Sequence, residues 1–196
     1  VTRALAQLMP GEPEVTGLLA LMLLQHSRRR ARLDAEAVPL TLEEQDRSLW
    51  DAAAIAEAGE LLNGAGRRAE PGPYRLQAAI AAVHATAESA AATDWQTIVA
   101  LYDRLLTVTP SPIVELNRAV AVGMASGPQV GLSALERVAA SGALDGYYLL
   151  AAARADLLRR LGEYGKAADF YRVALAGAPT QPERDFFARR LDEVGG

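Results

Sequence analysis

The sequence contains no cysteine among its 196 residues. Without a thiol, the chain cannot form a disulfide, a thiolate zinc site or an iron–sulfur cluster, and it cannot use a cysteine nucleophile. Histidine is also scarce, because His26 and His84 are the only two, and they lack the H-E-x-x-H spacing of a zinc protease. We therefore expect no metal and no other cofactor.

Long hydrophobic runs are missing as well. The longest apolar run, 15–24, is interrupted by Thr16 and Gly17 and is about half of the roughly 20 residues that a membrane-spanning helix needs. We expect a buried helix there, no membrane partner and a cytoplasmic location. The chain has no recognisable signal peptide and begins with Val rather than Met, so we expect it to be a fragment of a longer protein.

Aromatic residues make up only 6% of the chain, whereas 51% of it is hydrophobic. Alanine accounts for about 40 residues, a balance that favours closely packed helices over a sandwich of β-branched strands. The 20 basic residues face 24 acidic ones, which gives a net charge of −4. The chain as a whole therefore has no attraction for a polyanion such as DNA.

The first third of the chain predicts a helical subdomain over residues 1–65. Two helices, 1–9 and 12–27, form a hairpin that ends in Arg28, Arg29, Arg30 and Arg32. These cations either contact phosphate or complement the helix dipole, and we favour the helix-dipole interpretation. After a loop over 33–40 that holds at most a short extended piece, a capping box at 41–44 predicts a helix from Thr41 to about Leu62, with Trp50 on its apolar side.

A stretch rich in Gly, Pro and charge, 63–73, is interpreted as a loop between this subdomain and the rest. Beyond it, helix boundaries are well marked by two further capping boxes, 93–96 and 180–183, and by Ser111 before Pro112. The whole chain therefore predicts about ten helices and no convincing strand.

The chain contains an internal repeat. The segment 161–175, followed by Pro179, has the second-helix spacing of a tetratricopeptide repeat, and the same positions recur 69 residues earlier, about twice the 34-residue period of that repeat. The earlier copy comprises Trp95, Ile98, Tyr102, Leu105, Leu106 and Pro110. A middle copy lies near Gly131, Leu135 and Val138, without the aromatic residue and the proline.

These positions predict helix packing rather than ligand binding. Small residues such as Ala167 and Gly131 let the two helices of a hairpin approach, while Tyr171 and Tyr102 fill the groove to the next hairpin. We expect an all-α, right-handed solenoid with hairpins at 73–110, 112–143 and 146–179 and a capping helix at 180–195. Such arrays present a concave surface that binds an extended segment or a helix.

Nothing in the sequence indicates catalysis. No nucleophile elbow, phosphate-binding loop or dinucleotide fingerprint occurs, so we expect that the protein is not an enzyme. His84, at the edge of an apolar stripe, is interpreted as a structural histidine rather than a ligand or general base.

Polar residues inside otherwise apolar helices are more informative. Gln77, Asn117, Arg118, Arg154 and Asp156 interrupt such helices and either line the concave face or form internal pairs. In the second interpretation, Arg118 or Arg154 pairs with a carboxylate on an adjacent hairpin.

Five blocks together resemble a known family. They are 17–24 (GLLALMLL), 46–51 (DRSLWD), 72–85 (GPYRLQAAIAAVHA), 117–122 (NRAVAV) and 152–162 (AARADLLRRLG). Over nearly its whole length the chain resembles the C-terminal tetratricopeptide-like extension of bacterial extracytoplasmic-function (ECF) RNA polymerase sigma factors. No Arg/Lys-rich recognition helix follows a short turn, so neither DNA-reading sigma domain is recognisable here.

The resemblance implies a regulatory, protein-binding domain of a transcription-initiation factor. Its expected partners are its own sigma domains, core RNA polymerase or a signalling protein, and it would reach DNA only through sigma domains outside this chain. The candidate interaction surface comprises Asp46, Arg47, Trp50, Tyr74, Gln77, His84, Asn117, Arg118, Arg154 and Asp156. Two alternatives remain: a stand-alone scaffold, and a small-molecule sensor in which Tyr74, His84 and Asn117 line a pocket.

Overall fold

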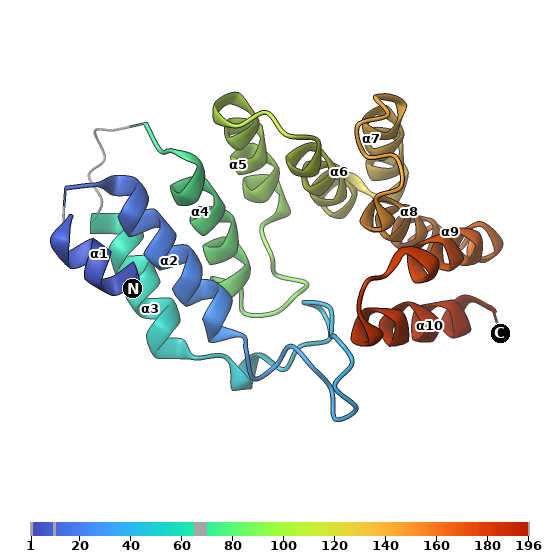
Figure 1. The fold of residues 1–196 in the computed structure, drawn as a ribbon, viewed down its shortest axis with the longest axis horizontal. Coiled ribbons are helices and arrows are strands. Elements are labelled where there is room, and N and C mark those ends of the chain that lie inside the picture. Colours follow the sequence, from blue (N-terminus) through green and yellow to red (C-terminus); the bar gives the residue numbers. More distant parts are fainter. Residues whose placement is uncertain (1, 10, 65–69, 196) are drawn as a thin grey trace. The chain divides into compact units, whose positions relative to one another are not determined.

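The computed structural model describes residues 2–9, 11–64 and 70–195. Over these ranges the protein is all-α, as predicted, with ten α-helices, one 3-10 helix and no strand beyond an isolated bridge between Leu33 and Pro39 (Figure 1). The helices are α1 (Thr2–Leu8), α2 (Pro13–Ser27), η1 (Arg47–Leu49), α3 (Ala52–Gly64), α4 (Pro73–Thr86), α5 (Trp95–Val108), α6 (Pro112–Ser126), α7 (Pro128–Ala140), α8 (Tyr148–Arg160), α9 (Tyr164–Gly177) and α10 (Gln181–Gly195). None of these described helices is long and apolar enough to cross a membrane.

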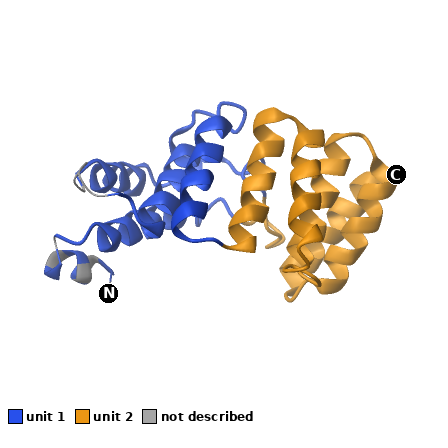
Figure 2. Cartoon of the chain, turned by 90° about the horizontal axis from the view of Figure 1, so that it is seen from above, with its two compact units in different colours: residues 1–32, 41–110 blue, residues 33–40, 111–196 orange. Residues whose placement is uncertain are grey.

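The chain divides into two compact units, which Figure 2 colours separately. Unit 1 comprises residues 1–32 and 41–110, and unit 2 comprises residues 33–40 and 111–196. The domain boundary that the sequence predicts, at 63–73, is therefore not the boundary between compact units. The reason is that α2 packs against both α3 and α4, which keeps α4 with the N-terminal helices.

Two contacts explain why α4 stays with α2. The carboxylate of Glu14 accepts hydrogen bonds from the backbone N–H groups of Tyr74 (2.8 Å) and Arg75 (3.3 Å) and so caps the start of α4. Near the middle of α2, Gly17 lies so close to Arg75 that a Cβ would lie 2.8 Å from its backbone nitrogen. Neither contact is visible in the sequence, because the partners are 58 or more residues apart.

Unit 2 is a series of helical hairpins. α6 packs against α7, α7 against α8, α8 against α9 and α9 against α10, which is the neighbour-to-neighbour packing of a helical repeat. At the first hairpin the two backbones nearly touch, since a Cβ on Gly131 would lie 2.4 Å from the Cα of Gly123. The prediction that Gly131 allows two helices to approach is confirmed.

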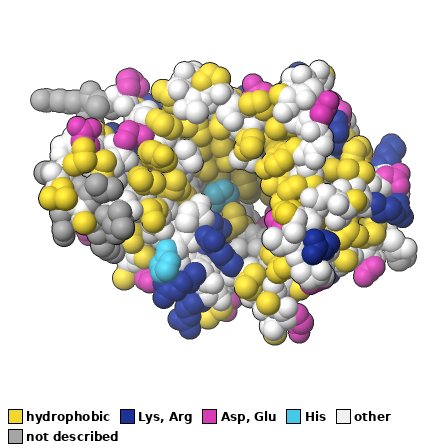
Figure 3. Space-filling model, in the orientation of Figure 1, with side chains coloured by type: hydrophobic (Ala, Val, Ile, Leu, Met, Phe, Trp, Pro, Cys, Tyr) yellow, Lys and Arg dark blue, Asp and Glu magenta, His cyan; other side chains and the backbone are white. Residues whose placement is uncertain are grey.

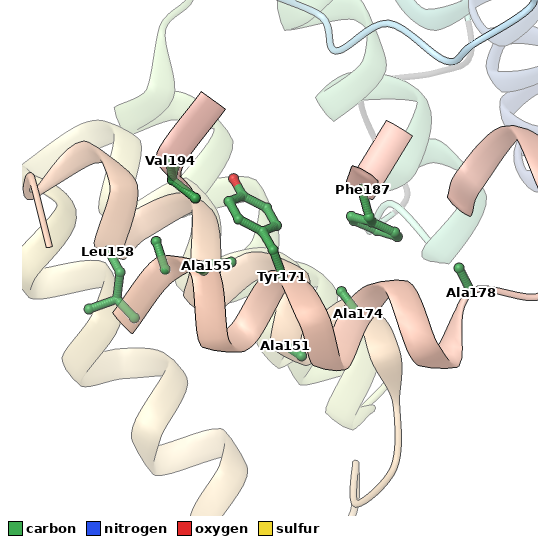
Figure 4. Packing of buried hydrophobic residues seen from close by; sticks show 10 residues of the cluster. Ala151, Ala155, Leu158, Tyr171, Ala174, Ala178, Phe187 and Val194 are labelled. Carbon is green, nitrogen blue, oxygen red and sulfur yellow. The ribbon is translucent and has the colours of Figure 1, made fainter. Parts of the chain in front are cut away.

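The core of the last hairpin has the predicted composition. Ala167 and Ala174 are completely buried, and the ring of Tyr171 is 2% exposed between α8 and α10 (Figure 4). Phe187 and Val194 of α10 complete the same cluster, so α10 covers the end of the array as expected for a cap.

Two of the three predicted capping boxes differ from expectation. At 41–44 the backbone N–H and hydroxyl of Thr41 both donate to the Glu44 carboxylate at 2.8 Å, but only a single turn follows. The helix begins at Ala52 instead, because Asp51 caps it by accepting from the Ala54 N–H at 3.0 Å. At 93–96 the cap is Asp94 rather than Thr93, and Thr93 is buried.

The third capping box is confirmed. The Thr180 N–H donates to Glu183 at 3.2 Å, and the Glu183 N–H donates back to the Thr180 hydroxyl at 3.4 Å. Ser111 precedes α6 as predicted, with Pro112 in the first helical turn, but its side chain makes no capping hydrogen bond. Both starts therefore lie where the sequence places them.

Candidate interaction surfaces

Four of the ten predicted surface residues, Asp46, Arg47, Trp50 and His84, meet in unit 1. Asp46 begins η1 by accepting a hydrogen bond from the Ser48 N–H at 2.9 Å, and this turn places Arg47 at the end of α4. The Arg47 guanidinium donates to the backbone carbonyls of His84 (2.8 Å) and Ala87 (2.9 Å). Arg47 therefore satisfies carbonyl groups that the end of α4 would otherwise leave unpaired.

The Trp50 ring packs against the guanidinium groups of Arg28 and Arg47. Its side chain is 7% exposed, and the Arg47 guanidinium lies 4.5 Å from the ring centroid, with that of Arg28 at 5.9 Å. Trp50 is thus a buried platform for two arginines rather than part of an exposed surface. The prediction that it lies on a helix beginning at Thr41 is wrong, since it follows η1 directly.

His84 is half-buried at the end of α4. Its ring makes an edge contact with the Trp95 ring, with 5.1 Å between centroids. Burial, reinforced by the positive charges of Arg28 and Arg47, lowers the pKa of His84 to about 4. The imidazole is therefore neutral at pH 7, which agrees with its interpretation as a structural residue.

Tyr74 and Gln77 lie on α4 with exposed side chains. In unit 2, Asn117 is exposed and Arg118 is half-buried on α6. Since Tyr74 and His84 belong to unit 1 and Asn117 to unit 2, the pocket postulated from these three residues stays a prediction.

Arg154 forms the internal pair that one interpretation predicted. Its guanidinium makes a bidentate ion pair with Glu136 of α7, at 2.9 and 2.6 Å, and it lies 5.3 Å from the Phe170 ring centroid. Asp156 is likewise engaged within its own helix, by Arg159 at 2.6 Å and Arg160 at 2.8 Å. Although burial alone would raise the pKa of Asp156, the hydrogen bonds from Arg160 and Arg159 keep it below its usual value.

A cavity of about 260 Å³ opens beside Arg154. Its aromatic lining comes from Tyr147, Tyr148 and Phe170, none of which is among the residues predicted from the sequence. The neighbouring tyrosines at 147–148 were the available signal, but their direction depends on the turn before α8. The Tyr148 hydroxyl donates to Glu183 at 2.7 Å, and burial together with that carboxylate raises the pKa of Tyr148 to about 12.

No group of three or more His, Asp or Glu side chains is placed to hold a metal ion in residues 2–9, 11–64 and 70–195. The described residues include two arginine-centred clusters, one in each unit. The cluster in unit 1 packs cations against an indole ring, and the cluster in unit 2 pairs its cation with a carboxylate beside a cavity.

The sequence is similar to one family model and to a longer protein. Residues 1–66 match the model of a family of unknown function, DUF6596. Over 194 residues the chain is 44% identical to the uncharacterized protein R00370 of Rhizobium meliloti (strain 1021), which covers 99% of this chain. The chain spans 45% of the length of that relative. No solved structure matches this chain.

Proposed function

We propose that residues 1–196 are a regulatory, protein-binding module of a longer cytoplasmic ECF-type RNA polymerase sigma factor. The module acts through contacts with its own sigma domains, with core polymerase or with a signalling protein. Promoter recognition belongs to the sigma domains, which lie outside this chain.

The architecture is the observation that carries this proposal. Stacked helical hairpins such as α6–α10 build extended surfaces for binding other proteins. The five blocks that resemble sigma-factor extensions are distributed over both units, and two of them meet directly where Arg47 of block 46–51 caps the helix of block 72–85. The relative is more than twice as long as the matched stretch, which leaves room for two sigma domains.

A binding experiment tests the proposal. Tagged residues 1–196 are immobilised and exposed in turn to core RNA polymerase and to the separately purified sigma domains of the protein that carries them. We expect saturable binding to at least one of these partners, with a Kd of about 10 μM or tighter, as for transient interfaces. Absence of binding to both at several times that concentration contradicts direct contact with the sigma domains or polymerase. The proposal as a whole is contradicted if deletion of residues 1–196 also leaves promoter-directed transcription unchanged.

Small-molecule sensing is the second candidate function, and the cavity beside Arg154 is the observation that favours it. A volume of about 260 Å³ suits a ligand smaller than most drug-sized molecules. A ligand that binds only the folded state raises the melting temperature. A thermal-shift screen therefore tests this function, with Tyr147→Ala as the variant that should abolish any shift produced through the cavity.

A further inference from the structure

Five arginines converge at one end of unit 1. Arg28, Arg29, Arg30 and Arg32 follow the last turn of α2, and Arg47 of η1 joins them over the Trp50 ring. The side chains of Arg29, Arg30 and Arg32 are exposed, and those of Arg28 and Arg47 are half-buried. Figure 3 shows the dark-blue basic side chains gathered where α2 ends. We refer to these five residues as the arginine cluster.

The hydrogen-bond partners of the cluster are neutral. Arg28 donates to the Gln25 side-chain oxygen at 2.6 Å, Arg32 donates to the same oxygen at 3.1 Å, and Arg29 contacts the His26 ring. Arg47 donates to backbone carbonyls. Among the residues that the structure describes, no carboxylate lies within ion-pair distance of any of the five.

The cluster therefore carries uncompensated positive charge. Burial lowers the pKa of Arg28, and the neighbouring charges of Arg32 and Arg47 lower it further. His84 responds to the same field, because Arg28 and Arg47 help to keep it neutral. The indole N–H of Trp50 is buried without a hydrogen-bond acceptor.

Helix dipoles account for only part of this arrangement. The ends of α2 and α4 both lie at the cluster, and each helix C-terminus corresponds to roughly half a negative charge. Two such ends offset roughly one of the five positive charges. The remainder is available to an anion from another molecule.

The charge distribution of the chain favours an acidic peptide over nucleic acid as the anion that binds the cluster. Without these five residues, 15 basic residues face 24 acidic ones. A nucleic-acid duplex extends its phosphates over a broad surface and would meet this excess of acidic groups, whereas a short acidic peptide segment covers only the cluster. Guanidinium groups also form bidentate hydrogen bonds with carboxylates.

We propose that the arginine cluster docks a short acidic segment of a partner protein, with several Asp or Glu side chains close together in sequence. The exposed Arg29, Arg30 and Arg32 bind its carboxylates, while Arg28 and Arg47, stacked on Trp50, form the base of the site. This inference is independent of the sigma-factor assignment, since it applies to whichever protein supplies the segment.

A fluorescein-labelled peptide of ten glutamates is the probe, and binding to the full 196-residue chain is followed by fluorescence anisotropy in 150 mM NaCl. We expect a Kd of about 100 μM or tighter. The double substitution Arg29→Glu/Arg30→Glu should weaken binding at least about tenfold, because it removes two positive charges and adds two negative ones. Arg29→Gln/Arg30→Gln should give an intermediate loss.

Lys166→Glu/Arg172→Glu is the matched control. It changes the net charge by the same amount at two exposed side chains of α9 outside the cluster, so it reports the effect of net charge alone. We expect it to weaken binding less than about twofold at this ionic strength. Circular dichroism melting checks that every variant is folded. In the wild-type chain, bound peptide should also shift the NMR signals of the His84 ring, which senses the field of Arg28 and Arg47.

Three results would overturn the inference. One is absence of peptide binding by the folded chain, and another is an equal loss in the control and cluster variants, which would mean net-charge attraction alone. The third is tighter binding of a 20-base-pair DNA duplex, lost in the cluster variant, which would assign the cluster to nucleic acid. If the Arg29→Glu/Arg30→Glu variant still binds core polymerase, the proposed function stands, and polymerase binding does not depend on the arginine cluster.

Discussion

Gly131 shows how a single missing side chain determines the spacing of two helices. A Cβ at this position would lie 2.4 Å from the Gly123 Cα and 3.1 Å from a methyl group of Leu157. Backbone atoms cannot move away as a flexible side chain can, so the α6–α7 hairpin requires glycine at this contact. The same reasoning explains why the middle repeat has a small residue although it lacks the aromatic one.

We expect Gly131→Ala to destabilise the protein by about 1–3 kcal/mol, because the added methyl group forces the two backbones apart. Urea unfolding followed by circular dichroism measures the change. Gly165→Ala is the control, since a Cβ there meets nothing within 4 Å, and it should leave stability unchanged or raise it by up to about 1 kcal/mol. Equal stability of wild type and Gly131→Ala would refute the close approach.

His84 makes folding sensitive to acid. Burial, Arg28 and Arg47 lower its pKa from 6.5 to about 4 in the folded state, whereas the unfolded chain retains the higher value. As pH falls from 6.5 toward 4, the unfolded state therefore takes up the proton first, and the free energy of unfolding decreases. By linkage the loss amounts to at most about 3 kcal/mol.

We predict that the free energy of unfolding of the wild type falls between pH 7 and pH 4 by up to about 3 kcal/mol more than that of His84→Gln. The glutamine variant retains a neutral polar side chain that does not titrate in this range. An NMR titration of the His84 ring checks the cause directly. A ring that titrates near pH 6.5 would show that the imidazole is not shielded from solvent and from protons.

At the level of elements, the start of α4 depends on a residue from another helix. Glu14 of α2 supplies the carboxylate that accepts from the first N–H groups of α4, in place of a capping side chain from Gly72. A negative charge at this position also interacts favourably with the helix dipole. One side chain thus begins α4 and attaches it to unit 1.

Glu14→Ala should lower the free energy of unfolding by about 1–2 kcal/mol, the usual effect of losing a helix cap. Amide hydrogen exchange should become faster in the first turn of α4. Glu12→Ala is the comparison, because Glu12 precedes α2 without a side-chain capping hydrogen bond. If both substitutions have the same small effect, the contact of Glu14 with α4 carries no energetic weight.

These elements show what sequence patterns can and cannot predict. Local signals were reliable where the pattern itself makes the contact, as at Thr180 and Glu183. At Thr41 only half of the box forms, because the Glu44 N–H donates to the Thr41 carbonyl rather than to its hydroxyl. The chain then turns so that Asp51 starts α3 and donates its N–H to the Ser27 carbonyl at 3.0 Å. The contact between Asp51 and Ser27 is long-range. No local pattern therefore indicates that the turn after Thr41 ends before a helix forms.

At the scale of the whole molecule, the loop 33–40 explains why the compact units differ from the predicted domains. Although it follows α2 in sequence, it belongs to unit 2, where Arg189 of α10 donates to the Asp34 carboxylate at 2.7 Å and to the Pro39 carbonyl at 3.2 Å. Asp34 and Arg189 are 155 residues apart. Such a pairing requires knowledge of the fold.

The sequence indicates the candidate residues one by one, but it indicates neither their grouping nor the burial of Trp50. The sequence selected Arg47, Trp50 and His84 separately, and the fold joins them with the arginines that follow α2. It selected Arg154 with its correct alternative, an ion pair across hairpins, but not the tyrosines of the adjacent cavity. Chemistry is thus readable from residue types, whereas co-location depends on packing.

Promoter-directed run-off transcription is the most direct test of the proposed regulatory role. Core polymerase is supplied with either the complete protein that carries this chain or the same protein lacking residues 1–196, and transcripts from its target promoter are quantified. The account predicts a change in transcript yield of at least about tenfold, equivalent to about 1.4 kcal/mol of coupling between this module and the sigma domains. Equal yields, with both proteins folded and equally bound to polymerase, would contradict it.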